Sequence, residues 1–259
     1  MEILHHVIAP EDFQIVIDIA KEAGREIMKI YDDPNNNWDV ELKKDDSPLT
    51  LADRRSHEVI DAKLSAHFPE IPILSEEGKD IPHSVRKDWP CYWCVDPLDG
   101  TKEFIKKNGQ FTVNIALMVN NEPVFGVIYI PVLDVIYYGQ KDKGSYKTEN
   151  GTTTAIHSLK KTGSLVAVGS KSHRSSQEDD YLSQFDVKEV ISIGSSLKFC
   201  LVAEGKAQIY YRHGPTMEWD TAAGHAIALY SGAHISQPNG DVFEYNKPNL
   251  LNPSFVCRA

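Results

Sequence analysis

The sequence predicts a fold of mixed α and β structure, with an α+β portion followed by a smaller α/β portion. Helical periodicity over residues 12–30 and 53–66 precedes several β-branched and aromatic segments between residues 91 and 138. After about residue 160, apolar strands alternate with helical stretches, which is typical of α/β structure. The 259 residues suffice for one large domain or for two closely packed ones. We place the division between residues 1–160 and 161–259.

The first portion is expected to open with two helices and to continue as a meander of strands. Apolar residues such as Phe13, Ile17 and Ile27 recur at helical spacing in the first helix, and the turn-forming run at 32–37 ends it. A short strand is expected to end at Leu74. Further strands are predicted at residues 92–95, 112–119, 124–130 and 135–138, with a polar turn at 147–151.

The second portion is expected to contain short apolar strands that alternate with helices. The predicted strands are residues 165–168, 190–193 and 208–211, and the predicted helices are residues 197–203 and 221–231. The chain contains no internal repeat and no low-complexity tract, so repeat architectures are excluded.

Charge and hydropathy narrow the classes of function. The formal net charge is −10, which argues against a nucleic-acid polymer as partner, because proteins that bind such polymers usually carry a basic face. The sequence lacks an apolar run of the roughly 18 residues that a membrane span needs. The first residues also lack the basic and apolar regions of a secretion signal. We therefore expect a cytoplasmic protein without a transmembrane segment.

The cysteines do not predict a disulfide framework or a zinc site. Four cysteines are few for a chain of this length. Cys91 and Cys94 form a C-x-x-C pair inside a predicted strand, where residues three apart point to opposite faces. We expect them to be core residues.

Two carboxylates follow a predicted strand in the run Asp96-Pro97-Leu98-Asp99-Gly100-Thr101. A turn rich in proline and glycine accounts for part of this pattern. The run then continues as a helix start, so carboxylates and the amides of Gly100 and Thr101 are expected to meet at one place. Carboxylates bind hard cations and free amides bind phosphate, which favours a metal site over a simple turn.

Three further carboxylates lie near the ends of predicted elements, and each has a simple structural interpretation. Asp53 and Asp220 precede helical stretches and could act as N-caps, each contributing about 1 kcal/mol. Glu76 follows a short strand and could belong to a solvated loop. Only their joint pattern points to a shared site.

That joint pattern resembles the lithium-sensitive inositol monophosphatase superfamily over nearly the whole chain. The resemblance lies in three motifs in the same order and at similar spacing: Ser75-Glu76-Glu77, Asp96-Pro97-Leu98-Asp99-Gly100-Thr101 and Glu218-Trp219-Asp220-Thr221-Ala222-Ala223-Gly224. It implies a layered αβαβα sandwich and a magnesium-dependent phosphatase inhibited by Li⁺.

The resemblance also implies roles for the carboxylates. The implied metal ligands are Glu76, Asp96, the carbonyl of Leu98, Asp99 and Asp220. Asp53 would hold a further ion through water and help to orient the nucleophilic water, with Thr101 polarising it. Five carboxylates at separations of about 6 Å repel one another by roughly 3 kcal/mol per pair at an effective dielectric near 20. Two or three Mg²⁺ ions are therefore expected to bind before an anionic substrate does.

The C-terminal half resembles the bacterial CysQ-type 3′(2′),5′-bisphosphate nucleotidases within that superfamily. The resemblance lies in residues 194–207, 214–220 and 102–106. Lys198, where inositol monophosphatases usually carry an asparagine, could contact a second phosphate together with the amide of Gly194, although by itself it reads as an ordinary surface lysine. Ser170 and His173 resemble residues that contact the nucleotide, although Lys171 stands where we expect an arginine. Asp99, Gly100, Thr101 and Asp220 would also contact the substrate.

The resemblance implies hydrolysis of 3′-phosphoadenosine 5′-phosphate to AMP and phosphate, which clears this small phosphonucleotide during sulfate assimilation. A water oriented by Glu76, Thr101 and Asp53 would attack phosphorus in line, without a phosphoenzyme. An inositol-phosphate phosphatase on the same fold is the nearest alternative, and a non-catalytic protein that binds metal or nucleotide is a further one. The sequence leaves open the oligomeric state and peripheral association with the cytoplasmic face of the inner membrane.

Overall fold

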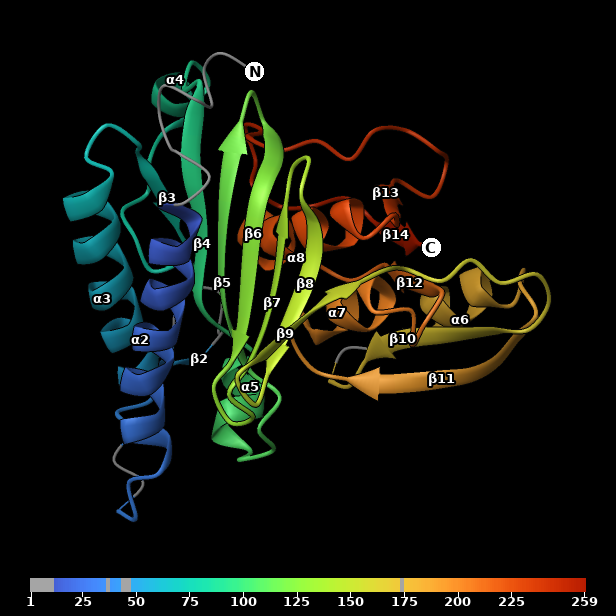
Figure 1. Ribbon diagram of the computed structural model, residues 1–259, viewed down its shortest axis with the longest axis horizontal. Helices are drawn as coiled ribbons and strands as arrows, with labels where there is room; N and C mark the ends of the chain where they lie inside the picture. Colours follow the sequence, from blue (N-terminus) through green and yellow to red (C-terminus); the bar gives the residue numbers. More distant parts are fainter. Residues whose placement is uncertain (1–11, 36–37, 43–47, 173–174) are drawn as a thin grey trace.

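The computed structural model describes residues 12–35, 38–42, 48–172 and 175–259. Figure 1 shows their arrangement in successive layers, with a helix pair, a large sheet, further helices, a second sheet and an outer helix. The αβαβα sandwich implied by the family resemblance is confirmed. Because the layers bury apolar faces against one another, two sheets give three separate cores, one on each side of the sheets and one between them.

The outermost layer consists of the helices α2 (Phe13–Tyr31) and α3 (Leu51–His67). They run antiparallel to each other and cover one face of the large sheet (Figure 1). The apolar positions of α2 lie on a single face, as the sequence periodicity predicts. Helix α3 begins at Leu51, two residues before the predicted start, because the Thr50 side chain accepts hydrogen bonds from the amides of Ala52 and Asp53.

The large sheet has seven strands in chain order, and its neighbours are antiparallel except for the first pair. The polar turn predicted at residues 147–151 is longer than the turn in the structure. Residues 147–149 continue a strand that pairs with residues 152–154, and only Asn150 and Gly151 turn. The strands are β3 (Ile73–Ser75), β4 (Cys91–Asp99), β5 (Thr112–Val119), β6 (Glu122–Ile130), β7 (Val135–Gln140), β8 (Gly144–Glu149) and β9 (Thr152–Ile156).

Helix α8 (Glu218–Tyr230) lies between the two sheets and contacts the large sheet very closely. A Cβ atom added to Gly126 of β6 would lie 2.5 Å from the carbonyl oxygen of Ala223. A Cβ atom added to Gly139 of β7 would lie 2.7 Å from the Cα of Ile227. Both glycines therefore let the helix backbone rest directly on the strands.

The second sheet has five strands in the order β11-β10-β12-β14-β13. Helix α7 (Leu197–Ala203) and α8 pack on one face, and α6 (Ser176–Leu182) packs on the other. The sequence predicts the first three of these strands and misses α6 and the last two strands. The strands are β10 (Leu165–Ser170), β11 (Val187–Ile193), β12 (Ile209–Arg212), β13 (His234–Ser236) and β14 (Phe255–Arg258).

Two remaining predictions concern the cysteines and the membrane. Cys91 and Cys94 contribute to the cores on opposite sides of β4, as expected for residues three apart on a strand. Within the part of the chain that the structure describes, none of the helices combines the length and the apolar character that crossing a bilayer requires.

The sheets separate between β9 and β10, but α8 from the C-terminal half packs on the N-terminal sheet, so the division at residue 160 stays a prediction.

Candidate active site

Three carboxylates converge at the end of the strands β3 and β4. Ser75 pairs with Val95, and the amide of Glu76 extends this ladder to the Val95 carbonyl at 3.1 Å, which places Glu76 beside Asp96. Asp220 reaches the same place from the first turn of α8. One carboxylate oxygen from each of Glu76, Asp96 and Asp220 lies within 4.8 Å of the others. Residues far apart in the sequence therefore form one acidic cluster.

Asp220 is not the N-cap of its helix, which corrects that interpretation. Helix α8 begins at Glu218, so Asp220 is its third residue. The Asp220 carboxylate accepts a hydrogen bond of 2.8 Å from the Met217 amide at the start of the helix. This bond fixes one oxygen, Oδ2, and orients the carboxylate into the cluster.

Asp53 is likewise not an N-cap, because Thr50 holds that position. The Oδ2 atom of Asp53 accepts hydrogen bonds from the Thr50 amide at 2.7 Å and from the Thr50 hydroxyl. Its Oδ1 atom accepts a hydrogen bond of 3.1 Å from the Thr101 hydroxyl. Asp53 thus joins α3 to the turn that follows β4.

The turn between Asp96 and α5 (Thr101–Ile105) is held by local hydrogen bonds. The Leu98 amide donates to Asp96 Oδ1 at 3.0 Å, and the Ser56 hydroxyl donates to the Pro97 carbonyl at 2.6 Å. Gly100 has φ of +95°, a backbone conformation that residues with a Cβ rarely adopt. The Leu98 carbonyl, a predicted metal ligand, lies 3.5 Å from the Thr101 hydroxyl. The sequence therefore folds this segment into the compact turn that the motif predicts.

Asp99 is oriented by a buried polar network that sequence reasoning missed. The Ser196 hydroxyl donates to Asp99 Oδ2 at 2.7 Å, and it accepts a hydrogen bond of 2.9 Å from the Asn114 side chain. The Thr112 hydroxyl donates to the Asn114 carbonyl oxygen at 2.9 Å, which directs the Asn114 amide group toward Ser196 and Asp99. A polar residue in the middle of an otherwise apolar strand, as at Asn114, was the available signal.

Burial and mutual repulsion make these carboxylates difficult to ionise together. Burial raises the pKa of Asp96 well above its usual value, and the nearby Glu76 and Asp99 charges raise it further. Burial likewise raises the pKa of Asp220, with Asp99 and Glu76 adding to the effect. A set of buried oxygen ligands that repel one another fits a hard divalent cation, which would supply the compensating positive charge.

Two buried cations also line this site, and we call the part that they form the basic end and the part that the carboxylates form the acidic end. Lys198 in α7 is only 7% exposed, and its ammonium group donates to the Ser195 carbonyl at 2.5 Å. Burial lowers the pKa of Lys198 to about 8. Arg212, at the end of β12, is paired with the buried Glu178 at 3.3 Å. Sequence reasoning missed Arg212, for which a charged residue directly after a predicted strand was the only signal.

A cavity of about 360 Å³ is lined by both groups of charged residues. Asp53, Asp96 and Leu98 are not among its lining residues and are each at most 2% exposed. His173 lies outside the described residues. The predicted site residues that the cavity brings together are Glu76, Asp99, Gly100, Thr101, Ser170, Gly194, Lys198 and Asp220.

Comparison with known proteins identifies close relatives. The 3′(2′),5′-bisphosphate nucleotidase CysQ of Salmonella typhimurium is 49% identical, with 93% of this chain and 96% of that protein covered. CysQ of Escherichia coli strain K12 is 48% identical at the same coverage. The crystal structure of CysQ from Bacteroides thetaiotaomicron is 44% identical and superposes with a TM-score of 0.83 over 94% of this chain and 95% of that one. These findings confirm the resemblance to CysQ-type proteins.

More distant structures share the fold, and a family model covers the chain. An IMPase from Thermotoga maritima superposes with a TM-score of 0.80 at 20% identity, over 96% of this chain and 92% of that one. Residues 10–258 match the model of the inositol monophosphatase family, a span that includes every candidate site residue named above. The chain therefore belongs to the inositol monophosphatase family.

Proposed function

We propose that the protein is a metal-dependent phosphatase that hydrolyses the 3′-phosphate of 3′-phosphoadenosine 5′-phosphate, giving AMP and phosphate. The observation that carries the proposal is that carboxylates and the buried Lys198 and Arg212 line the same cavity. A substrate with two phosphates matches both ends, whereas a monophosphate needs only one. The names of the CysQ relatives support the same reaction.

We assign the acidic end to two or three Mg²⁺ ions. Glu76, Asp96 and Asp220 would hold them because their carboxylate oxygens form one cluster, and we add Asp99 and the Leu98 carbonyl as ligands from the same turn as Asp96. Magnesium ions bound there would lower the pKa of water and neutralise charge on the phosphate. The raised pKa values of Asp96 and Asp220 support this assignment, since they report carboxylates that lack a compensating charge.

Thr101 and Asp53 are assigned to the nucleophilic water. The Thr101 hydroxyl donates its hydrogen to Asp53, so its oxygen can accept a hydrogen bond from the water. A water held in this way by Thr101 and Glu76 directs its own lone pair at phosphorus. Burial raises the pKa of Asp53, which makes its carboxylate a better proton acceptor. Direct attack by water requires no covalent phosphoenzyme.

The nucleotide is assigned to the C-terminal wall of the cavity. Lys198 and Arg212 would contact the 5′-phosphate, with the amide of Gly194 nearby. Ser170 also lines the cavity and is assigned to the nucleoside. His173, which lies outside the described residues, keeps its proposed role in nucleotide contact.

We further propose a cytoplasmic location. All four cysteines are free and buried, which supports a compartment that keeps thiols reduced.

A substrate panel tests the function. Purified protein is assayed for phosphate release with 3′-phosphoadenosine 5′-phosphate, 3′-AMP, 5′-AMP and inositol 1-phosphate, in the presence of Mg²⁺. We expect the bisphosphate to have the highest kcat/KM, EDTA to abolish activity, Mg²⁺ to restore it, and Li⁺ to inhibit. A tenfold or greater preference for inositol 1-phosphate contradicts the assignment.

A further inference from the structure

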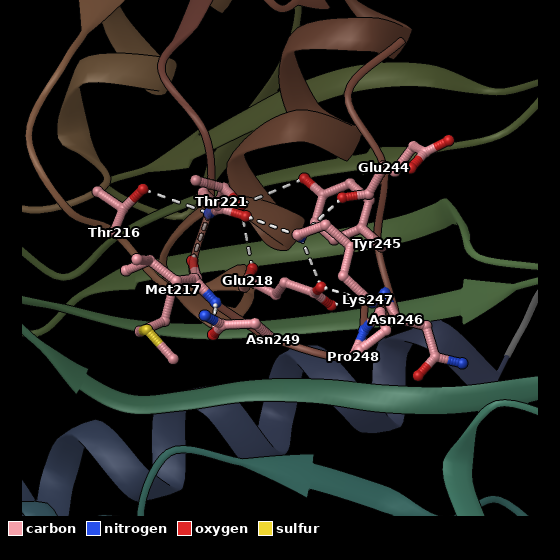
Figure 2. Close-up of polar contacts among 12 residues, drawn as sticks. Thr216, Met217, Glu218, Thr221, Glu244, Tyr245, Asn246, Lys247, Pro248 and Asn249 are labelled. Atoms are coloured by element: carbon pink, nitrogen blue, oxygen red, sulfur yellow. Dashed lines mark hydrogen bonds and ion pairs between the residues drawn. The ribbon is translucent and has the colours of Figure 1, made fainter. Parts of the chain in front are cut away.

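Glu218 is a buried charged residue to which the proposed reaction gives no role. It is the first residue of α8, and it is 0% exposed. Its carboxylate accepts hydrogen bonds from the Asn246 amide at 2.7 Å and from the Lys247 amide at 3.0 Å. Figure 2 shows this carboxylate facing the segment from Tyr245 to Pro248, with the first turn of α8 on its other side. Asn246 has φ of +57°, which turns two consecutive amides toward the same carboxylate.

Lys247 completes the binding of this carboxylate. Its ammonium group lies 2.6 Å from Glu218 Oε1, and the Lys247 side chain is 18% exposed. The same group donates to the Glu244 carbonyl at 2.9 Å and to the Asn252 side chain at 3.3 Å. Each of the three ammonium hydrogens thus has an acceptor, and the pair holds the residues 244–252, called here the clamp segment, against α8.

The clamp segment is also joined to the connection between β3 and β4. Arg86, at the end of α4 (His83–Arg86), donates to the Asn246 side-chain oxygen at 2.7 Å and to the Pro248 carbonyl at 3.0 Å. The Asn246 side chain donates back to the Arg86 carbonyl at 2.8 Å. Arg86 lies in the chain between the two carboxylates Glu76 and Asp96. The clamp segment therefore links α8, which carries Asp220, to the connection that runs in the chain between Glu76 and Asp96.

Backbone contacts fix the clamp segment to the start of α8. The Glu218 amide donates to the Leu250 carbonyl at 3.0 Å. The Asn252 amide donates to the Thr216 carbonyl at 2.8 Å, and the Asn252 side chain donates to the Met217 carbonyl at 2.7 Å. Met217 in turn donates its amide to Asp220. The position of the Asp220 carboxylate thus depends on the turn that the clamp segment holds.

We propose that Glu218 is a positioning residue for metal binding, acting through Lys247, Asn246 and Arg86 to hold Asp220 beside Glu76 and Asp96. The inference rests on the metal site of the proposed function. Three carboxylates within 4.8 Å repel one another, so the metal-free protein separates them unless a rigid contact prevents it. Separation lowers metal affinity, because the ligands must be brought together again.

Stability alone does not account for a charge at this position. Burying an ion pair costs desolvation energy, and apolar residues of similar volume are often equally or more stabilising. A fully buried carboxylate two residues before Asp220 instead supplies three directional bonds to the clamp segment, from the amides of Asn246 and Lys247 and from the Lys247 ammonium group. Directional bonds define a geometry more narrowly than apolar contact does.

The test measures metal affinity directly. Metal-free wild type and the variants Glu218→Gln and Lys247→Met are titrated with Mg²⁺ in a calorimeter, and their Tm is recorded in EDTA. We expect the dissociation constant to rise at least tenfold in Glu218→Gln. We expect about a threefold rise in Lys247→Met, which keeps both backbone hydrogen bonds to Glu218. At saturating Mg²⁺, kcat should recover to within about threefold of wild type.

Glu204→Gln is the matched control. Glu204 is a half-buried glutamate whose side chain is 8% exposed. It pairs with Lys206 at 2.9 Å and with Lys147 at 3.9 Å, at the far end of α7 from Ser196. This variant should lose stability without losing metal affinity. Wild-type affinity in both Glu218→Gln and Lys247→Met overturns the inference, as does equal weakening in Glu204→Gln.

The outcomes also separate this inference from the proposed function. A wild type that binds Mg²⁺ but hydrolyses none of the four phosphate esters contradicts the function, and weaker binding in Glu218→Gln still supports the positioning role. An active wild type with unchanged metal affinity in both variants contradicts the positioning role alone. A wild type that binds no Mg²⁺ overturns both.

Discussion

The two ends of the cavity handle buried charge in opposite ways. At the acidic end, burial and neighbouring carboxylates act in the same direction, and both raise the pKa of Asp96 and Asp220. At the basic end, burial lowers the pKa of Lys198 while the charge of Asp99 opposes this shift, and Arg212 is paired with Glu178. The protein thus balances its buried cations with its own carboxylates, Asp99 and Glu178, whereas the pKa values of Asp96 and Asp220 stay raised until a bound cation compensates them.

The largest effect is expected at the acidic end. In Asp96→Asn, the amide oxygen can still accept the hydrogen bond from Leu98, but the negative charge is lost. We expect activity to fall about 10³-fold or more, because loss of a ligand carboxylate removes several kcal/mol of transition-state stabilisation. We also expect a higher Tm in EDTA, since one of three repelling charges is gone. Normal turnover in this variant contradicts the site, and a lower Tm contradicts the description of an uncompensated acidic end.

The basic end should discriminate between substrates. In Lys198→Met, we expect kcat/KM for 3′-phosphoadenosine 5′-phosphate to fall about 100-fold, in the range found when one member of a buried charge pair is removed. Activity on 3′-AMP, which lacks the 5′-phosphate, should change little. Lys206→Met is the control, because the side chain of Lys206 is 58% exposed. Equal losses on both substrates would show that Lys198 acts on the reacting phosphate instead.

His225, in the helix α8 between the two sheets, should make the stability of the protein depend on pH in the opposite direction to the buried carboxylates. Burial lowers the pKa of His225 to about 3, so below pH 6.5 the unfolded chain takes up a proton that the folded protein does not. Stability attributable to His225 therefore falls as pH falls, on the order of 2 kcal/mol between pH 7 and pH 5. The carboxylates with raised pKa act in the opposite direction, because their folded forms bind protons more readily.

Comparing wild type with His225→Asn isolates that contribution, since the carboxylates are common to both proteins. Urea denaturation in EDTA at pH 7 and pH 5 gives the free energy of unfolding of each. The difference in free energy of unfolding between the variant and wild type (variant minus wild type) should be larger at pH 5 than at pH 7, by on the order of 2 kcal/mol. A difference that does not change with pH contradicts a buried neutral His225.

The smallest effect is expected where the two ends meet. In Ser196→Ala, Asp99 loses a hydrogen bond of 2.7 Å and Asn114 loses one of its two acceptors. A hydrogen bond to a charged group contributes about 1.5–3 kcal/mol, and the second donor of Asn114 to Asp99 remains. We expect kcat/KM to fall about tenfold, measured with 3′-phosphoadenosine 5′-phosphate. A loss as large as that of Asp96→Asn would indicate that Ser196 itself contacts the reacting groups.

At the acidic end, local elements alone favoured a metal site only for Asp96 and Asp99, and the family resemblance supplied the remaining carboxylates. The structure brings Glu76, Asp96 and Asp220 together, as that resemblance implies. The helix positions of Asp53 and Asp220 were not predicted. For each, an N-cap is the simple alternative to a site role, whereas each is the third residue of its helix and accepts a hydrogen bond from a backbone amide before the helix begins. The N-cap and the third position of a helix both favour an acidic residue. The type of residue therefore does not show which of the two positions it occupies.

The basic end and the clamp segment could not be predicted in the same way. Arg212 contacts Glu178 from 34 residues away, and Lys247 contacts Glu218 from 29 residues away. Such pairs follow no period of helix or strand, and a single sequence offers no other signal for them. The turn predicted at 147–151 was wrong for a related reason, since the polar residues Lys147 and Thr148 belong to a paired strand of the sheet.

The close contact between α8 and the large sheet has a consequence for engineering the protein. At Gly126 and Gly139 there is no space for even a methyl group, because the helix backbone occupies it. Substitution there would displace the whole helix, and Asp220 with it, although neither glycine lines the cavity. A library that seeks new substrates should therefore vary the C-terminal wall of the cavity and leave these two strand positions unchanged. The residues that limit how far the enzyme can be altered would then lie at strand positions outside the lining of the cavity.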